Sequence, residues 1–221
     1  MQLGNVSGAD IFTQHSPFRT ARGTGVYGGH VRWRGPGARA ETARLSRLDA
    51  VRPRAYAALS EVERARLATL SDAAADEVLL GRWLLRSLAA EAVPGAEPQD
   101  VVVEATCPAC GREHGRPTLP GLGLLGSIAH AGGLVVAAVA RRDAWSAVGI
   151  DTEPVGAQGL GEAELLRWTE REAIGKALGV GIVEHVALDP AAGRPDDAAR
   201  PDGWRLERLA TPGHLTTLAL R

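Results

Sequence analysis

The fold is decided by a short pattern, Val148-Gly-Ile-Asp-Thr-Glu-Pro154, which begins with apolar residues and ends at a proline. Such a pattern is typical of a β-strand. Side chains alternate along a strand, so Asp151 and Glu153 are expected to point to the same face. The strand therefore presents two carboxylates together.

The next pattern along the chain is helical: Trp168-Thr-Glu-Arg-Glu-Ala-Ile-Gly-Lys-Ala-Leu-Gly179. Its apolar residues recur at threes and fours, which predicts a helix with one apolar face. Trp168, Glu172 and Lys176 stand at i, i+4 and i+8, so they lie one above another on that helix. A helix that faces the preceding strand would bring Glu172 toward the two strand carboxylates.

Together, Asp151, Glu153 and Glu172 would form an oxygen site suited to a hard cation such as Mg²⁺. Lys176, one turn further along the helix, would hold a phosphate group beside that metal. It is also the only lysine among the 25 lysine and arginine residues of the chain. Because an ammonium is compact and a guanidinium is a planar fork, the retained lysine indicates a geometric demand. The competing interpretations are solvated surface carboxylates and a chance surface lysine.

The two patterns in this order, Gly149-Ile-Asp-Thr-Glu153 and Trp168-Thr-x-Arg-Glu-Ala-x-x-Lys176, resemble the paired signature of the 4′-phosphopantetheinyl transferases. Among the types of this family, the chain resembles most the larger, single-chain bacterial type, which activates carrier domains of polyketide and nonribosomal peptide synthases. The resemblance covers roughly residues 60–190. It implies an α+β fold of two pseudo-symmetric halves facing each other, the second half shortened. The implied activity is Mg²⁺-dependent transfer of 4′-phosphopantetheine from coenzyme A to a serine of an acyl or peptidyl carrier protein.

The resemblance also assigns roles to individual residues. The implied metal ligands are Asp151, Glu153 and Glu172. The implied catalytic residues are Glu172, which would take the proton from the carrier serine, and Lys176. The implied contacts to coenzyme A are Arg66, Arg116 within Gly115-Arg-Pro117, His130 within Gly126-Ser-Ile-Ala-His-Ala-Gly132, and Lys176.

Several positions depart from the family pattern. Ala129 stands where a second serine is usual, and Glu63 and Glu77 stand where basic residues are common. The segment 154–167, which in the family helps to receive the carrier protein, is shorter here. These departures keep two alternatives open. One is another Mg²⁺-dependent enzyme of the same fold that acts on a diphosphate or a small molecule, and the other is a non-catalytic carrier-binding protein.

Composition sets the broad class. The chain has 221 residues, 45% of them apolar, which is enough for an ample core. A net charge of −1 provides no global field toward nucleic acid or a membrane surface. No signal peptide or long apolar span is evident, and two cysteines are too few for a secreted disulfide framework. We expect a cytoplasmic monomer.

Three parts are expected along the chain: an N-terminal arm at residues 1–29, an N-terminal half at 30–147 and a C-terminal half at 148–221. Within the first half, Ser60-Glu-Val-Glu63 is a capping box that predicts the start of a helix, and a second helix is expected from Ser71. The region 39–58 is expected to be partly helical, with a break at Pro53. Strands are expected at 30–33, 101–104, 134–140, 182–188, 204–209 and 214–220.

The two cysteines belong to Cys107-Pro-Ala-Cys-Gly-Arg-Glu-His114. A Cys-x-x-Cys pattern with a histidine four residues later is compatible with zinc. Only three candidate ligands are local, however, and no second cysteine pair completes a tetrahedron. A tight turn stabilised by glycine is therefore favoured, with zinc and a redox pair as alternatives.

Overall fold

The computed structural model describes residues 25–27, 30–180 and 203–221. Seven strands form an antiparallel sheet in the order β1-β2-β3-β7-β6-β5-β4, and three more form a second sheet in the order β8-β10-β9. The strands of the larger sheet are β1 (Gly25–Tyr27), β2 (His30–Gly35), β3 (Ala38–Arg44), β4 (Glu104–Thr106), β5 (Glu113–Leu119), β6 (Leu124–Ala131) and β7 (Leu134–Arg141). Those of the smaller sheet are β8 (Val148–Pro154), β9 (Arg205–Leu209) and β10 (His214–Leu220).

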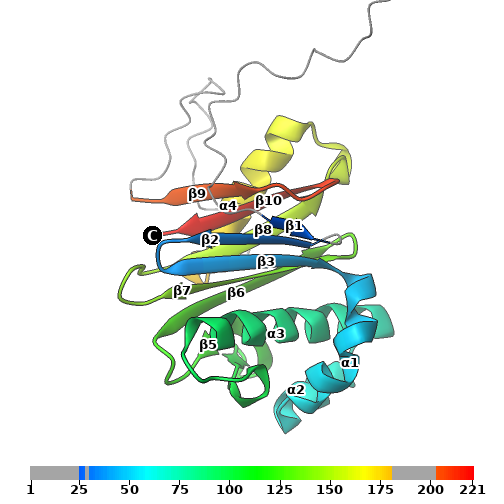
Figure 1. Ribbon diagram of the computed structural model, residues 1–221. Coiled ribbons are helices and arrows are strands. Elements are labelled where there is room, and N and C mark those ends of the chain that lie inside the picture. The colour runs from blue at the N-terminus through cyan, green and yellow to red at the C-terminus, as the bar shows by residue number, and fades with distance from the viewer. Residues whose placement is uncertain (1–24, 28–29, 181–202) are drawn as a thin grey trace, which may run out of the picture.

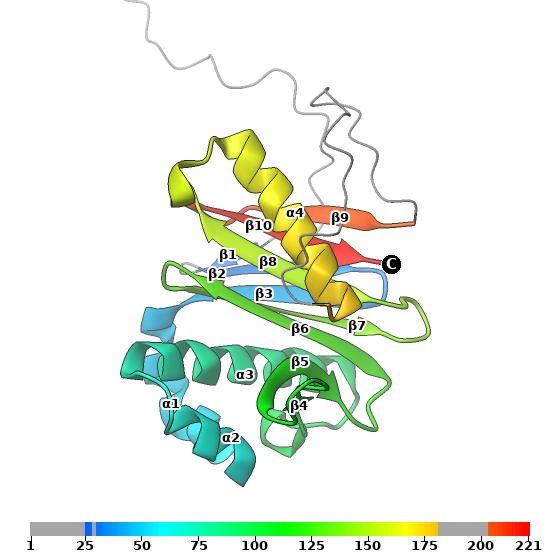
Figure 2. The same ribbon diagram turned by 180° about the vertical axis from the view of Figure 1, so that it is seen from behind.

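Helices cover the outer faces of the two sheets, so that the described chain has four layers (Figure 1). The helices are α1 (Leu48–Ala57), α2 (Glu61–Leu67), α3 (Asp72–Ala92) and α4 (Glu162–Leu178). The long helix α3 lies along the larger sheet, and α4 crosses β8 and β10 on the far side of the smaller sheet (Figure 2). The predicted α+β class is confirmed.

Apolar side chains fill each space between the layers. One buried cluster joins α1 and α3 to the larger sheet and includes Leu80 and Val135. A second lies between the sheets, where Val148 and Ile150 of β8 pack against residues such as Trp33. A third, smaller cluster lies between α4 and the smaller sheet. Burying such faces on both sides of a sheet is the main source of stability for this kind of fold.

The alternation of β8 fixes the position of the candidate site. Val148 and Ile150 point into the space between the sheets, whereas Gly149 and Asp151 face α4. The strand also pairs with β10 over its whole length, with Asp151 opposite Thr217. The predicted strand 148–154 is therefore confirmed at both ends.

Other local predictions are confirmed as well. The Ser60 hydroxyl accepts a hydrogen bond from the Glu63 amide, and the Glu63 carboxylate accepts one from the Ser60 amide. This is the predicted capping box. Ser71 is the N-cap of α3. Strands β2, β7, β9 and β10 lie where their patterns predicted them, while the strand predicted at 182–188 falls outside the described residues.

Some local predictions hold only in part and others are wrong. The region 39–58 is helical in part, as predicted, since α1 covers Leu48–Ala57, but its first residues belong to β3, which pairs with β2 and β7. Its alanines favour a helix locally, but pairing on both edges overrides that weak preference. The helix α1 does not break at Pro53; its buried apolar face holds the helix through the proline. The strand expected at 101–104 begins only at Glu104, and residues 25–27 of the expected arm form β1.

No helix in the described part of the chain is long and apolar enough to cross a lipid bilayer.

Candidate functional site

A cavity of about 330 Å³ lies where α2, α3, β5, β6 and α4 meet. Its polar lining comes from five side chains that are far apart in the sequence: Arg66, Arg82, His114, His130 and Lys176. No acidic side chain is among the lining residues in the described part of the chain. Arg66, Arg82 and Lys176 are cations, and a concave site lined by several cations is suited to a polyanion such as a phosphate ester or a diphosphate.

Lys176 connects this cavity to the three carboxylates. Its Nζ lies 2.5 Å from Oδ1 of Asp151, whose side chain is almost fully buried. The close approach of α4 to β8 makes this contact possible, because Gly149 leaves room for the α4 backbone. Oδ2 of Asp151 is buried and has no hydrogen-bond partner among the described residues. One oxygen of this carboxylate is thus held by the lysine, and the other is free to accept a cation.

Glu153 and Glu172 are half-buried beside Asp151. Burial raises the pKa of each of these glutamates, and the charge of Asp151 raises it further. Burial also raises the pKa of Asp151, against the opposing charge of Lys176. A cation bound beside these carboxylates would stabilise their charged forms.

The structure does not assemble these carboxylates into a finished metal site. Among the described residues, the only group of three potential ligands with all ligand atoms within 4.8 Å of one another is Cys107, Cys110 and His114. Lys176, predicted to hold a phosphate, instead contacts Asp151, although it also lines the cavity.

His130 and Arg66 both reach the cavity, but each also has a protein partner. Nδ1 of His130 lies 2.9 Å from a carboxylate oxygen of Glu77. Arg66 donates a hydrogen bond to the backbone carbonyl of Glu113. These contacts orient the two side chains at the cavity wall. They also explain Glu77, which stands where the family pattern suggests a cation and here holds the histidine.

Among the four predicted contacts to coenzyme A, Arg116 is the one that does not line the cavity. Its strand neighbours Gly115 and Pro117 both line the cavity. Its Cδ lies near Gly179 at the end of α4. Burial lowers the pKa of Arg116, and the nearby Arg142 charge lowers it further.

Comparisons with known proteins leave the family open. No protein-family model matches the chain, and a search of curated proteins finds no match. The chemistry available to the site therefore follows from its geometry.

Arg82 is a site residue that the sequence reasoning missed. Its side chain is only 6% exposed, and its Nη1 is buried without a hydrogen-bond partner among the described residues. Nε lies 3.4 Å from Glu63 and Nη2 lies 3.0 Å from Glu113. The sequence did contain a signal: this arginine lies within the apolar stripe of a predicted helix. A cation buried at such a position requires polar partners. Arg82 adds a desolvated positive charge to the cavity wall.

Besides capping α2, Glu63 pairs with buried arginines. It lies 2.7 Å from Nη2 of Arg86, which also donates to the carbonyl of Val101. Burial raises the pKa of Glu63, but the hydrogen bond and charge of Arg86, with the Ser60 amide and Arg82, lower it to a net value below the usual 4.5. A lowered pKa means that this stabilisation is complete above pH 4.5 and is lost as the pH falls through the folded value.

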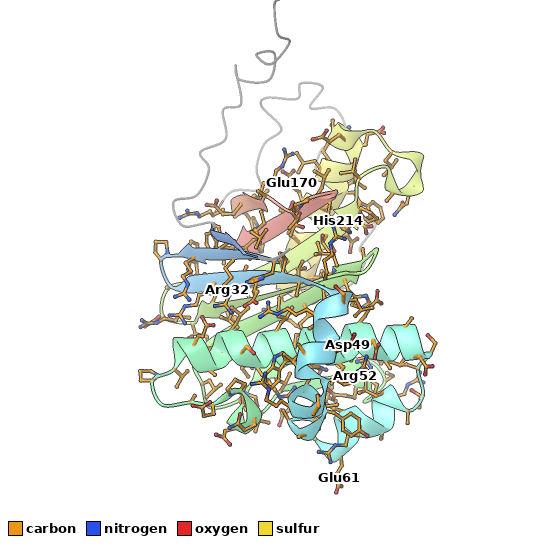
Figure 3. All side chains as sticks on the ribbon, turned by 45° about the vertical axis from the view of Figure 1, so that its right-hand side comes forward. Arg32, Asp49, Arg52, Glu61, Glu170 and His214 are labelled. Atoms are coloured by element: carbon orange, nitrogen blue, oxygen red, sulfur yellow. The ribbon has the colours of Figure 1, made fainter. Side chains whose placement is uncertain are left out.

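Glu63→Gln is accordingly expected to lower the free energy of unfolding by about 2 kcal/mol at neutral pH, because two buried arginines lose a charged acceptor. Thermal unfolding at pH 7 and at pH 4 measures this loss of stability. The difference in melting temperature between the wild type and the variant should be smaller at pH 4. The control is Glu61→Gln in the same helical turn, whose side chain points away from the body (Figure 3). A Glu63→Gln variant as stable as that control would contradict the role of this network.

Proposed function

We propose that this protein transfers 4′-phosphopantetheine from coenzyme A to a serine of an acyl or peptidyl carrier protein. One observation carries the proposal: Arg66, His130 and Lys176, singled out in three separate parts of the sequence as ligands of coenzyme A, line one cavity. Arg82 adds a further buried cation there. Coenzyme A carries a diphosphate and a 3′-phosphate, which matches a cavity with several cations.

The proposal includes the fold of two pseudo-symmetric halves suggested by the resemblance. In its support, each sheet carries one long helix on its outer face, α3 on the larger sheet and α4 on the smaller (Figure 2). The cavity lies between these halves, with lining residues from both.

Magnesium fits the residues present. The buried Oδ2 of Asp151 has no hydrogen-bond partner among the described residues, and burial together with the charge of Asp151 raises the pKa of Glu153 and of Glu172. A cation would offset both costs. Asp151, Glu153 and Glu172 would hold the ion. When bound, Mg²⁺ supplies neutralisation of charge on the diphosphate.

The protein's own residues supply the remaining chemistry. Lys176 and His130 would stabilise negative charge on the phosphate oxygens, while Arg66 and Arg82 would hold the nucleotide-side phosphates. Glu172 is half-buried with a raised pKa, which is the property expected of a general base. It would take the proton of the carrier serine, directly or through water, as that hydroxyl attacks the phosphorus on the pantetheine side of the diphosphate. The bond from that phosphorus to the bridging oxygen would break, and adenosine 3′,5′-bisphosphate would leave.

One observation favours a second function. The connection from β8 to α4 contains only a short helical turn, Ala157–Gly159, before α4 begins at Glu162. This leaves little surface for docking a carrier protein. The second candidate is therefore a Mg²⁺-dependent enzyme that acts on a nucleotide diphosphate without a carrier.

One incubation tests both functions. The purified protein is mixed with Mg²⁺, coenzyme A and a panel of apo carrier domains, and the carriers are read by intact mass. The proposal expects one phosphopantetheine added per carrier, none without Mg²⁺ and none on carriers whose acceptor serine is alanine. Cleavage of coenzyme A with every carrier unmodified would support the second function. If coenzyme A neither binds nor reacts, the transfer function is wrong.

Lys176→Arg is expected to reduce turnover about tenfold to a hundredfold, or roughly 1.4–2.7 kcal/mol at 1.36 per decade. Nζ of Lys176 fits between Asp151 and the cavity, and a wider guanidinium would displace the carboxylate or the diphosphate. Steady-state kinetics should show the loss mainly in kcat. The control is Arg171→Lys, the reverse exchange at an exposed position of α4. Equal rates for Lys176→Arg and wild type would mean that any cation suffices there.

A further inference from the structure

The loop between β4 and β5 brings three metal-binding side chains together. The ligand atoms of Cys107, Cys110 and His114 all lie within 4.8 Å of one another. Sγ of Cys110 lies 2.9 Å from Nε2 of His114. The family resemblance gave no role to this cluster, and it is separate from the three carboxylates described above.

The backbone of the loop is built to hold this arrangement. The amide of Gly111 donates to the carbonyl of Cys107 at 2.8 Å, and the amide of Cys107 donates to the carbonyl of Arg112 at 2.8 Å. Gly111 has a φ of +71°, a conformation that glycine adopts without strain. This tight turn brings the two cysteines close together, and His114 follows on β5. The predicted glycine turn is present, and it is the support of the cluster rather than an alternative to it.

We propose that Cys107, Cys110 and His114 bind one Zn²⁺ ion. Two thiolates and one imidazole are ligands that zinc prefers, and the Cys-x-x-Cys spacing is the usual one for its sites. On binding, each thiol loses its proton to solvent and the metal takes the place of the contact between Cys110 and His114. Cys110 and His114 are exposed, which gives the ion a path of entry.

In the described part of the chain, no further cysteine, histidine or carboxylate belongs to the cluster. The fourth coordination position of the ion therefore has no protein ligand there. Zinc sites with three protein ligands hold water or a bound molecule in the fourth position. His114 also lines the cavity, so the ion would lie at the cavity's rim.

The effect of the ion on the cavity follows from Glu113, the residue before His114. Its carbonyl accepts a hydrogen bond from Arg66, and its carboxylate lies 3.0 Å from Arg82. Zinc would fix the hairpin that carries these contacts, and with it the two arginines of the cavity wall. The metal site therefore has an organising role that does not depend on the transfer reaction.

The test uses the full chain, purified with reductant and stripped with a chelator. Zinc is then titrated against a competing chromophoric chelator, and Co²⁺ is substituted to record thiolate-to-metal charge-transfer and tetrahedral ligand-field bands. We expect about one zinc per chain and a melting temperature raised by a few degrees. Cys107→Ser, Cys110→Ser and His114→Asn should each weaken binding at least a hundredfold, since even residues behind the ligands are typically worth 10- to 100-fold. Ala109→Ser, in the same loop, should bind as the wild type does.

Each other outcome overturns the proposal. If the wild type binds less than about a tenth of an equivalent of zinc, the site is excluded, whether or not the variants fold. Undiminished binding by His114→Asn would exclude the three-ligand set. A mass lower by two hydrogens without reductant, together with no affinity for zinc when reduced, would assign the cysteines to a disulfide instead.

Discussion

Asp151→Asn is expected to lower the transfer rate on the order of a thousandfold, about 4 kcal/mol at 1.36 per decade, while the protein stays folded. The side chain keeps its shape but loses its charge. A neutral amide would no longer hold the Lys176 ammonium as an ion pair, and it offers a poor ligand where the buried Oδ2 of the carboxylate has no other partner. Steady-state rates with coenzyme A and an apo carrier measure the loss.

The stability of this variant provides a second readout. Burial raises the pKa of Asp151, so the charged form is costly in the folded state. Lys176 is about a third exposed and can reach water when its partner is removed. We therefore expect the melting temperature of Asp151→Asn to be unchanged or slightly higher, the usual relation at a site where function opposes stability.

The matched control is Asp143→Asn, which makes the same exchange at an exposed aspartate paired with Arg141. It should leave both rate and melting temperature unchanged. Transfer at the wild-type rate by Asp151→Asn would remove this carboxylate from the chemistry, and with it the proposed magnesium site.

The sequence predicted those parts of the fold whose local signals agree with one another. β8 ends at a proline and β10 follows Pro212-Gly213, and both strands lie where they were expected. For β3 the local and the global signals conflict. Its Ala- and Arg-rich sequence favours a helix, and only pairing with β2 and β7 makes it a strand. Such pairing partners cannot be read from a local pattern.

The candidate site was predictable to the same extent. Charge and spacing identified Asp151 and Lys176 as one site, but not that the two would contact each other, because a lysine can pair with a carboxylate as well as with a phosphate. Arg82 was missed because its partner Glu113 lies 31 residues away. The ligands of the proposed zinc site were visible in the sequence, whereas the distances that favour zinc over a simple turn come only from the fold.

Gly149→Ser is expected to have the largest effect on stability, about 4 kcal/mol, because a backbone contact gives way much less than a side chain. A Cβ at this position would lie 1.9 Å from the carbonyl oxygen of Ala173 and 2.6 Å from the amide nitrogen of Ala177. Both atoms belong to the backbone of α4, so the whole helix would have to move away from β8. For a chain of this size, the loss corresponds to a fall of roughly 10 °C in melting temperature.

The same displacement should separate Lys176 from Asp151, since the two residues are held together by this helix and this strand. Differential scanning calorimetry measures the stability, and any folded fraction should lose transfer activity in addition. Gly161→Ser is the matched control: it precedes α4, its nearest neighbour for an added Cβ is 3.9 Å away, and serine is a favoured N-cap. The control should unfold within a few degrees of wild type. If Gly149→Ser does so as well, α4 does not rest on β8 as closely as this contact requires, and the positions of Glu172 and Lys176 over the strand carboxylates lose their support.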